Sequence, residues 1–337
     1  IVYTPLHGTG ISIIPQALKA YGFENVSIVS PQAIPDGNFP TCVSPNPEEP
    51  SALELGLRQA QSEEADILLA TDPDADREAI AVKKKNGEWV LLNGNQTATL
   101  FSYYLLKRWS EEGKLNGKQY IIKTIVTTEM IKKVAERFGV DCFDTLTGFK
   151  HIAAKIRELE GVKEFIGGGE ESFGFLIGDF VRDKDAVSGC CILAEMAAYA
   201  ASNGETLYDM LLNLYTEFGF YQEKQVSVVK KGKSGAEEIA KMMNDFRNTP
   251  PQTIDGVSVT QIIDYLKPEI TGLPKSNVLQ YFLSDGSKVS VRPSGTEPKI
   301  KFYFSICSQM GNVDLIEQRQ DEALQKIDRI KQELELN

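Results

Sequence analysis

The stretch DILLATDPDADREAIAVKKKNGEWVLL, residues 66–92, decides the fold of the first part of the chain. Residues 66–71 form a short apolar run of the length expected for a buried strand, and they end at an acidic segment. A second apolar run starts at Ala79, and Asn86 and Gly87 then separate it from a third, which is the pattern of a β-hairpin. The stretch therefore predicts a strand, an acidic loop and a hairpin in succession.

The segments on both sides of this stretch alternate between strand and helix patterns, which favours parallel α/β architecture. Ahead of it, the predicted elements are strands at 1–4 and 25–30, helices at 12–23 and 51–65, and an irregular proline-rich loop at 31–50. Behind it, they are helices at 95–109, 128–139, 149–160 and 185–203, with strands at 119–126, 141–146 and 164–172. Two related α/β domains are expected, at residues 1–95 and 96–220.

The pattern changes after residue 221, where short strands dominate. A strand at 224–229, a helix at 235–248 and several strands up to residue 306 precede a final helix at 313–336. One face of that helix carries Ile316, Leu324, Ile327, Ile330 and Leu334, as a helix covering an antiparallel sheet requires. Residues 221–337 are therefore expected to form a smaller α+β domain.

Composition excludes several classes of protein. The 337 residues include 36 Lys and Arg against 47 Asp and Glu, so a net charge of -11 argues against a nucleic-acid partner. No apolar run approaches 18 residues, which argues against a membrane role. Five cysteines without C-x-x-C spacing indicate reduced thiols and a cytoplasmic location. Because the chain opens on a strand pattern without methionine, we expect it to be part of a longer protein.

The acidic segment offers the strongest candidate site. Asp72, Asp74 and Asp76 would share one side of an extended segment, where three carboxylates repel unless a cation such as Mg²⁺ neutralises them. Arg77 is placed to balance this charge or to hold a phosphate. Two alternatives are an acidic turn that ends a strand and a phosphatase nucleophile of the haloacid-dehalogenase type, which requires a hydroxyl residue in place of Asp76.

Two further polar loops are candidate ligand sites. In GGGEESFGF, residues 167–175, Glu170 and Ser172 could bind sugar hydroxyls, with Arg182 and Lys184 adding positive charge nearby, unless the segment is only a flexible loop. In VRPSGTEPKIKFY, residues 291–303, the candidate phosphate cradle consists of Arg292, Ser294, Gly295 and Thr296, and a plain hairpin turn is the alternative.

Three other side chains deserve separate interpretation. Lys150, after the glycine turn in LTGFK, is a candidate general acid or base, although a solvated helix lysine is the more frequent case. His7 could face a phosphate, but a hydrogen bond within its own loop is favoured. Neither His7 nor His151 has the spacing of a metal site.

These motifs occur in an order that resembles a known family. TPLHGTG, PDGNFPT, ATDPDADR, TGFK, GGGEESFGF with RDKDAV, and RPSGTEPK together resemble the α-D-phosphohexomutase superfamily, which includes phosphoglucomutases and phosphomannomutases. The resemblance covers essentially the whole chain and is nearest to bacterial phosphoglucomutases. It implies that residues 1–95, 96–220 and 221–337 are the second, third and fourth of four family domains. The first domain, which carries a phosphoserine, would be absent.

The resemblance also implies roles for the candidate residues. Asp72, Asp74 and Asp76 would hold Mg²⁺ with that phosphoserine, and Arg77 would contact its phosphoryl group. Glu170 and Ser172 would bind sugar hydroxyls, Lys150 would be a general acid or base, and residues 292–296 would hold the distal phosphate. Phe173 and Phe175 depart from the glycine and histidine frequent in phosphomannomutases, which weakens a mannose assignment.

The implied reaction is the interconversion of glucose 1-phosphate and glucose 6-phosphate. It proceeds through the phosphoserine and a glucose 1,6-bisphosphate intermediate that also serves as activator, so the chain alone is expected to be inactive. The alternatives are a phosphomannomutase, a phosphopentomutase or a non-catalytic protein that binds sugar phosphates.

Overall fold

The computed structural model describes residues 1–230, 232–295 and 297–336. The backbone divides into two compact units, one from Ile1 to Leu211 and the other from Leu212 onward. The division falls within a helix, α7 (Leu207–Phe218).

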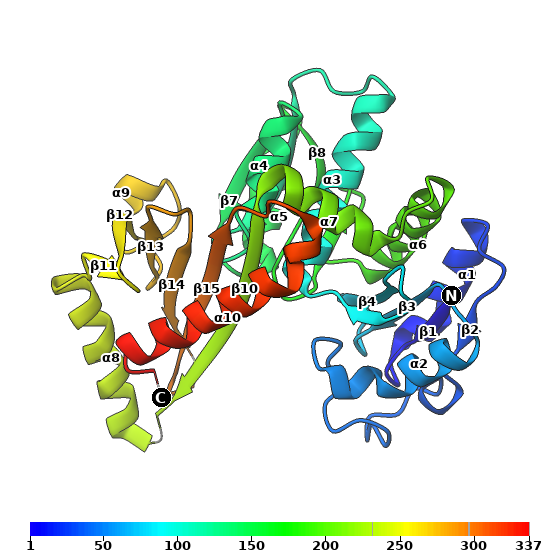
Figure 1. The fold of residues 1–337 in the computed structure, drawn as a ribbon, viewed down its shortest axis with the longest axis horizontal. Coiled ribbons are helices and arrows are strands. Elements are labelled where there is room, and N and C mark those ends of the chain that lie inside the picture. The colour runs from blue at the N-terminus through cyan, green and yellow to red at the C-terminus, as the bar shows by residue number, and fades with distance from the viewer. Residues whose placement is uncertain (231, 296, 337) are drawn as a thin grey trace. The chain divides into compact units, whose positions relative to one another are not determined.

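The first unit begins with a five-stranded mixed sheet, drawn in blue and cyan in Figure 1. Its strands, in the spatial order β2-β1-β3-β4-β5, are β2 (Ser27–Ile28), β1 (Val2–Thr4), β3 (Ile67–Thr71), β4 (Glu78–Lys83) and β5 (Trp89–Leu91). The associated helices are η1 (Thr9–Ser12), α1 (Ile14–Ala20), η2 (Ser30–Gln32) and α2 (Pro50–Ser62). The predicted hairpin is confirmed, since β4 pairs antiparallel with β5.

Strand direction in this sheet depends on the connections. The strands β2 and β3 both run parallel to β1, because helical crossovers link them. In contrast, β3 and β4 are antiparallel, since only the short acidic loop joins them. This loop therefore leaves β3 at its carboxyl end and returns into the same sheet.

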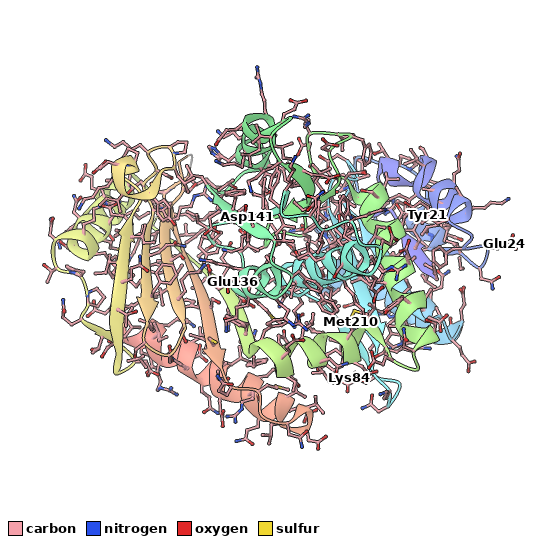
Figure 2. The ribbon with its side chains drawn as sticks, turned by 90° about the horizontal axis from the view of Figure 1, so that it is seen from above. Tyr21, Glu24, Lys84, Glu136, Asp141 and Met210 are labelled. Carbon is pink, nitrogen blue, oxygen red and sulfur yellow. The ribbon has the colours of Figure 1, made fainter. Side chains whose placement is uncertain are left out.

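The second part of the first unit holds a four-stranded sheet in the order β7-β6-β8-β9. Its strands are β6 (Gln119–Thr124), β7 (Asp141–Thr145), β8 (Glu164–Gly169) and β9 (Phe175–Ile177). Besides α7, its helices are α3 (Gly94–Glu111), α4 (Met130–Arg137), α5 (Phe149–Leu159) and α6 (Ala186–Ser202). The sequence predicted neither β9 nor α7. A short turn connects α4 to β7. Figure 2 labels Glu136 on α4 and Asp141 at the start of β7.

The second unit is an antiparallel sheet with helices packed on it, as the sequence predicted for this part of the chain (Figure 1). Its order is β10-β15-β14-β13-β12-β11. The strands are β10 (Phe220–Val229), β11 (Thr253–Ile254), β12 (Val257–Asp264), β13 (Leu279–Leu283), β14 (Lys288–Pro293) and β15 (Lys299–Ser308). The helical segments are α8 (Gly232–Asn248), α9 (Pro268–Thr271), η3 (Val313–Leu315) and α10 (Ile316–Glu333). On α10, Ile327 and Ile330 of the predicted apolar face are fully buried.

Replacement of Asp285 by asparagine is expected to destabilise the second unit by about 1 kcal/mol at pH 7. Asp285 lies in the turn between β13 and β14, where it accepts from the Ser287 amide and pairs with Lys326 of α10. Burial raises its pKa, but Lys326 and Ser287 outweigh burial and lower the pKa overall. Its contribution is therefore present above the ordinary value near 4 and is lost as pH falls through the lowered pKa.

Urea unfolding followed by circular dichroism at several pH values measures this effect. The control is Asp328→Asn on α10, because that carboxylate is exposed and, among the described residues, its ion pair is with Lys331 one turn away. Equal losses for the two variants, or a loss from Asp285→Asn that does not shrink in acid, would contradict the prediction.

Among the described residues, no helix combines the length and the apolar character needed to cross a bilayer.

Candidate active site

The acidic loop, residues 72–77, forms a tight turn between β3 and β4. Ala75 has a left-handed backbone with φ of +58°, and its amide donates to the carbonyl of Asp72 at 3.1 Å. One carboxylate oxygen of Asp72 also accepts from the amides of Asp76 and Arg77, each at 3.1 Å. The prediction of an extended segment with alternating side chains is wrong here, because the chain has to reverse into the antiparallel β4.

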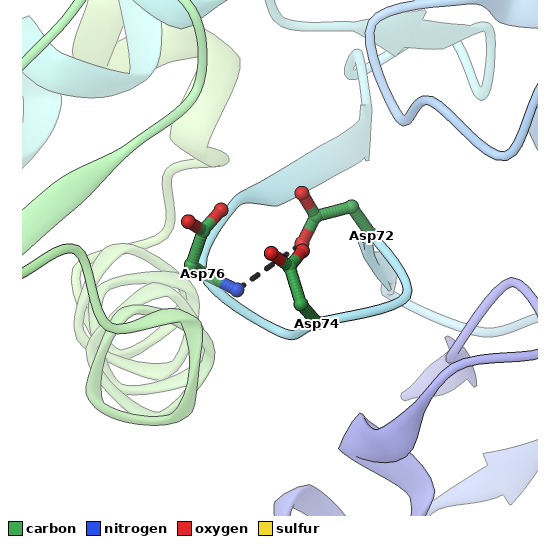
Figure 3. A group of neighbouring side chains, drawn as sticks. All are labelled: Asp72, Asp74 and Asp76. Atoms are coloured by element: carbon green, nitrogen blue, oxygen red, sulfur yellow. Dashed lines mark hydrogen bonds between the residues drawn. The ribbon is translucent and has the colours of Figure 1, made fainter. Parts of the chain in front are cut away.

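The turn nevertheless brings the three aspartates together. One carboxylate oxygen from each of Asp72, Asp74 and Asp76 lies within 4.8 Å of the others (Figure 3). Asp72 is buried, Asp76 is half-buried and Asp74 is exposed. Because three carboxylate oxygens gather in one place, this group offers the hard oxygen ligands that Mg²⁺ prefers.

Two cationic side chains flank the carboxylates. The Arg77 Nε lies 2.6 Å from Oδ2 of Asp72, and the Lys184 Nζ lies 2.8 Å from Oδ2 of Asp76. Burial raises the pKa of Asp72 to about 6, although its hydrogen bonds with Arg77 oppose the rise. The loop thus combines negative charge for a cation with an arginine and a lysine that suit a phosphoryl group.

Glu78, the residue that follows Arg77, is fully enclosed in the sheet. Its Oε2 has no hydrogen-bond partner among the described residues, and burial together with Asp185 and Asp72 raises its pKa well above the ordinary value. The carboxyl fits beside α6 because Gly189 has no side chain, since a Cβ there would lie 2.7 Å from the Glu78 carboxyl carbon. The sequence analysis did not single out this residue.

The glycine-rich loop, residues 167–175, comprises the end of β8, the turn at residues 170–174 and the start of β9. The amide of Glu170 donates to the carbonyl of Gly174 at 2.9 Å, and its Oε1 accepts from the amide of Gly148 at 2.8 Å. Burial is the main cause of a raised pKa for Glu170. Ser172 is half-buried in the same loop. The loop therefore forms a hydrogen-bonded turn.

The neighbouring Glu171 binds two hydroxyl groups near the end of β6. Its Oε2 accepts from the hydroxyls of Thr124 and Thr127, at 3.1 and 3.2 Å, which lie at and just after the end of β6. The sequence analysis gave Glu171 no role, and the threonine pair was the only signal that could have suggested one.

The remaining candidates of the first unit occupy different surroundings. Lys150 is exposed in the first turn of α5, two residues after Gly148. Arg182 is also exposed, and its Nη2 lies 3.2 Å from Oε1 of Glu160. Of the two cations predicted near the glycine-rich loop, Lys184 meets the acidic loop, whereas Arg182 pairs with the end of α5.

The predicted phosphate cradle lies in the second unit, at the turn from β14 to β15. The amide of Ser294 donates to the carbonyl of Lys299 at 2.7 Å, and its hydroxyl accepts from the amide of Glu297 at 3.3 Å. A cavity of about 470 Å³ opens here between Pro293, Ser294 and Gly295 and the apolar side chains of α8. Arg292 is half-buried near the end of β14, and Thr296 lies outside the described residues.

His7 and the cysteines lie in surroundings that favour a structural role over a catalytic one. The His7 ring is buried and lies 2.8 Å from the Thr41 hydroxyl and 3.2 Å from the Ile34 carbonyl, so it is held by hydrogen bonds as predicted, although both partners belong to the proline-rich loop at 31–50 and not to its own loop. All five cysteines are free. Burial raises the pKa of Cys42, Cys142, Cys190 and Cys191, so these thiols are poor nucleophiles.

Two consecutive parts of the chain match two consecutive domains of one protein family. Residues 1–87 match the family description phosphoglucomutase/phosphomannomutase, alpha/beta/alpha domain II, and residues 93–218 match domain III of the same family. The chain belongs to the phosphoglucomutase/phosphomannomutase family. The boundaries at residues 95 and 220 stay a prediction.

Individual relatives agree with this assignment. A phosphoglucomutase of Staphylococcus haemolyticus is 39% identical over 328 residues, which is 94% of this chain and 58% of the relative. The chain thus spans less than two thirds of the curated relative it matches. Parafusin of Paramecium, a phosphoglucomutase, superposes with a TM-score of 0.67 at 18% identity, covering 98% of this chain and 58% of that one. A phosphoglucomutase/phosphomannomutase family protein of Burkholderia thailandensis gives 0.65 at 19%, covering 98% and 59%.

Proposed function

We propose that the chain is the part of a magnesium-dependent phosphoglucomutase that follows a phosphoserine-bearing domain, and that the longer protein interconverts glucose 1-phosphate and glucose 6-phosphate. The observation that carries the proposal is the convergence of Asp72, Asp74 and Asp76 beside two cations, in a chain of this family. The free cysteines fit a cytoplasmic enzyme.

Asp72, Asp74 and Asp76 are the proposed Mg²⁺ ligands. When bound, the ion would neutralise charge that develops on the oxygens of a transferring phosphoryl group. Arg77 is proposed to contact the same phosphoryl group, and Asp72 holds its Nε at 2.6 Å, so the guanidinium needs no reorganisation. These residues bind and orient a phosphoryl group but supply no nucleophile.

Glu170 and Ser172 are the proposed ligands of the sugar hydroxyls. The Gly148 amide fixes the Glu170 carboxyl, which suits it to accept from vicinal hydroxyls in a defined direction. Lys184 is proposed to add positive charge between the acidic loop and the sugar, and Arg182 to contribute from farther out. Lys150 is the proposed general acid or base, because it lies in the first turn of α5, next to the Gly148 amide that binds Glu170.

Arg292, Ser294, Gly295 and Thr296 are the proposed ligands of the phosphate that is not being transferred. A guanidinium group, two hydroxyl groups and backbone amides in one short segment support this role. A glucose 1,6-bisphosphate that reorients between its two transfers would present either phosphate to this loop in turn. We accordingly assign residues 1–95, 96–220 and 221–337 to three successive family domains, the last of which holds the distal phosphate.

An assay of two proteins tests the proposal. The longer protein and residues 1–337 alone are each given Mg²⁺, glucose 1-phosphate and a trace of glucose 1,6-bisphosphate, and glucose 6-phosphate is detected. We expect turnover by the longer protein and none by residues 1–337. Parallel assays with mannose 1-phosphate and ribose 1-phosphate are expected to be slower.

Two outcomes would contradict this function. Turnover by residues 1–337 alone would show that a preceding domain is not needed. Absence of turnover by the longer protein with all three sugar phosphates would favour a protein that binds sugar phosphates without transfer.

A further inference from the structure

We propose that Phe173 is a positioning residue that fixes the glycine-rich loop against the acidic loop, so that the sugar hydroxyls and the transferring phosphoryl group are held in register. This inference rests on the proposed function for its catalytic consequence. Its structural part, the attachment of one loop to the other through Phe173, stands on the contacts within the first unit.

Phe173 combines an unfavourable backbone with a buried ring. Its φ of +66° lies in the left-handed region, which a non-glycine residue rarely adopts without tertiary support. The side chain is only 8% exposed, although the residue lies in the loop between β8 and β9 of the other sheet. A strained backbone persists only where other contacts stabilise it. The burial of the ring is the contact that offsets the strain at Phe173.

The ring belongs to the core of the first sheet and not to that of its own sheet. It clusters with buried side chains of β1, α2, β3 and β4, namely Val2, Leu53, Leu68, Ala70 and Ala79. A buried cluster of the second sheet and α5 instead contains Tyr120, Ile122, Phe149, Ile152, Ile156, Phe165 and Leu176. Phe173 therefore anchors the glycine-rich loop in the part of the structure that carries the acidic loop.

The backbone of Phe173 makes the same connection. Its carbonyl accepts from the amide of Glu78 at 3.1 Å, and Glu78 is the residue directly after the acidic loop. The loop also lies close to the start of α3, since a Cβ on Gly94 would lie 2.0 Å from the carbonyl oxygen of Glu171. The loop backbone therefore contacts both β4 and α3.

Lys184 supplies a second connection next to Phe173. Its aliphatic stem passes over Gly174, where a Cβ would lie 2.2 Å from the lysine Cδ, and its Nζ reaches the Asp76 carboxylate at 2.8 Å. A direct bond from the acidic loop to the start of α6 also exists, because Ala186 donates to the Ala75 carbonyl at 3.2 Å. Of these connections, Phe173 is the one that attaches through apolar burial.

Loss of the Phe173 ring should affect catalysis because phosphoryl transfer depends on the distance between the reacting atoms. Group transfer requires the reacting atoms to approach within about 3 to 3.5 Å, and a misplacement of about 1 Å costs roughly 100-fold in rate. Glu170 and Ser172 lie one to three residues before Phe173, so their positions relative to Asp72 and Asp76 depend on where the ring is seated. Removal of the ring should therefore loosen both loops together.

Amide hydrogen exchange on residues 1–337 tests the attachment. The variant is Phe173→Ala, and the control is Leu53→Ala, which removes another buried side chain from the same core cluster. The exchange rates of the Glu78 and Glu170 amides are divided by the exchange rates of the β3 amides. This ratio corrects for global destabilisation. We expect at least a tenfold rise of this ratio in Phe173→Ala and little change in Leu53→Ala.

A second variant, Phe173→Leu, covers the case in which Phe173→Ala does not fold. Leucine keeps an apolar side chain in the cluster, so the ratio should lie between those of the parent and Phe173→Ala. The proposal is overturned if loss of the ring leaves both amides as protected as in the parent, or if Leu53→Ala raises the ratio equally.

Steady-state kinetics of the longer protein tests the catalytic part separately. Phe173→Ala should lower kcat for glucose 1-phosphate at least tenfold, with a smaller change in KM, whereas Leu53→Ala should leave kcat within about twofold at a temperature where it is folded. Equal kcat losses would overturn the catalytic part. If the parent itself shows no turnover, the proposed function fails, while the exchange ratio still decides whether Phe173 attaches the two loops.

Discussion

Asp74→Asn is expected to lower turnover of glucose 1-phosphate by the longer protein by roughly 100- to 1000-fold, the range found when one preorganised electrostatic group is removed from a transfer site. The same change in residues 1–337 should weaken Mg²⁺ binding at least tenfold in isothermal titration calorimetry. The reason is that asparagine keeps one oxygen donor but removes a negative charge from the group of three carboxylates.

Asp74 is the most informative of the three aspartates to change. Asp72 accepts two backbone amides and pairs with Arg77, and Asp76 pairs with Lys184, so replacing either would also disturb the turn. Asp74 is exposed, and no hydrogen bond or ion pair of its carboxylate occurs within the described part of the chain. Its replacement should therefore leave the fold unchanged.

The matched control is Asp66→Asn. Asp66 is also exposed and lies just before β3, at the opposite end of the strand that leads into the acidic loop. The two variants carry the same change in net charge, so a nonlocal electrostatic effect would appear in both. Unchanged Mg²⁺ affinity in Asp74→Asn, or equal losses in the two variants, would show that Asp74 is not a ligand.

Local pattern predicted most of the fold in the first unit. The hairpin at Asn86 and Gly87 forms as expected because the turn residues and the apolar runs on each side agree. Helix α7 was missed although its sequence contains a signal: Thr206 and Asp209 cap each other's backbone amides, a spacing of three that marks helix starts. That omission was avoidable.

The geometry of the acidic loop depended on tertiary structure. The identity of Asp72, Asp74 and Asp76 predicts a cation site, but their convergence arises from the left-handed turn at Ala75 and not from strand alternation. The turn is required because β4 pairs antiparallel with β3, which only the assembled sheet determines. The sequence therefore predicted which residues could bind the cation, but it did not predict the turn that brings them together.

Long-range contacts lay beyond sequence patterns altogether. The sequence showed Phe173 only as a difference from the glycine frequent in phosphomannomutases. Nothing in the neighbouring sequence indicates that its ring enters the core of a sheet whose strands lie about 100 residues earlier in the chain. The burial of Glu78 beside Gly189 is a similar case, because the two residues lie on different elements. Such pairs become visible only when the packing of β4 against α6 is known.

A different long-range contact, the buried ammonium group of Lys123, should have the largest effect on stability. Lys123 lies in β6 with no exposed surface, directly before Thr124, which binds Glu171. Its Nζ lies 2.7 Å from Asp144 and 3.0 Å from Glu129. Burial alone would lower the pKa of Lys123, but the two carboxylates outweigh burial and raise it.

Removal of both carboxylates, in Glu129→Gln with Asp144→Asn, is expected to destabilise the first unit by about 3 kcal/mol, because a buried charge then lacks its counterions. Addition of Lys123→Met to that variant should restore most of the loss, since an apolar side chain of similar length replaces the charge. Urea unfolding measures both, and fluorescence reports on this unit because Trp89 and Trp109, the two tryptophans of the chain, lie in it.

The pH dependence separates an ionic effect from a packing effect. Without the two carboxylates, burial should lower the pKa of Lys123 below its unfolded value near 10.4, so the unfolded state binds more protons at intermediate pH. The stability of the double variant should then rise relative to the parent as pH increases from 7 toward 10. The triple variant should lose this slope, because methionine does not titrate. A loss that is independent of pH, or that Lys123→Met fails to recover, would mean that the carboxylates act through packing and that the ammonium group does not need them.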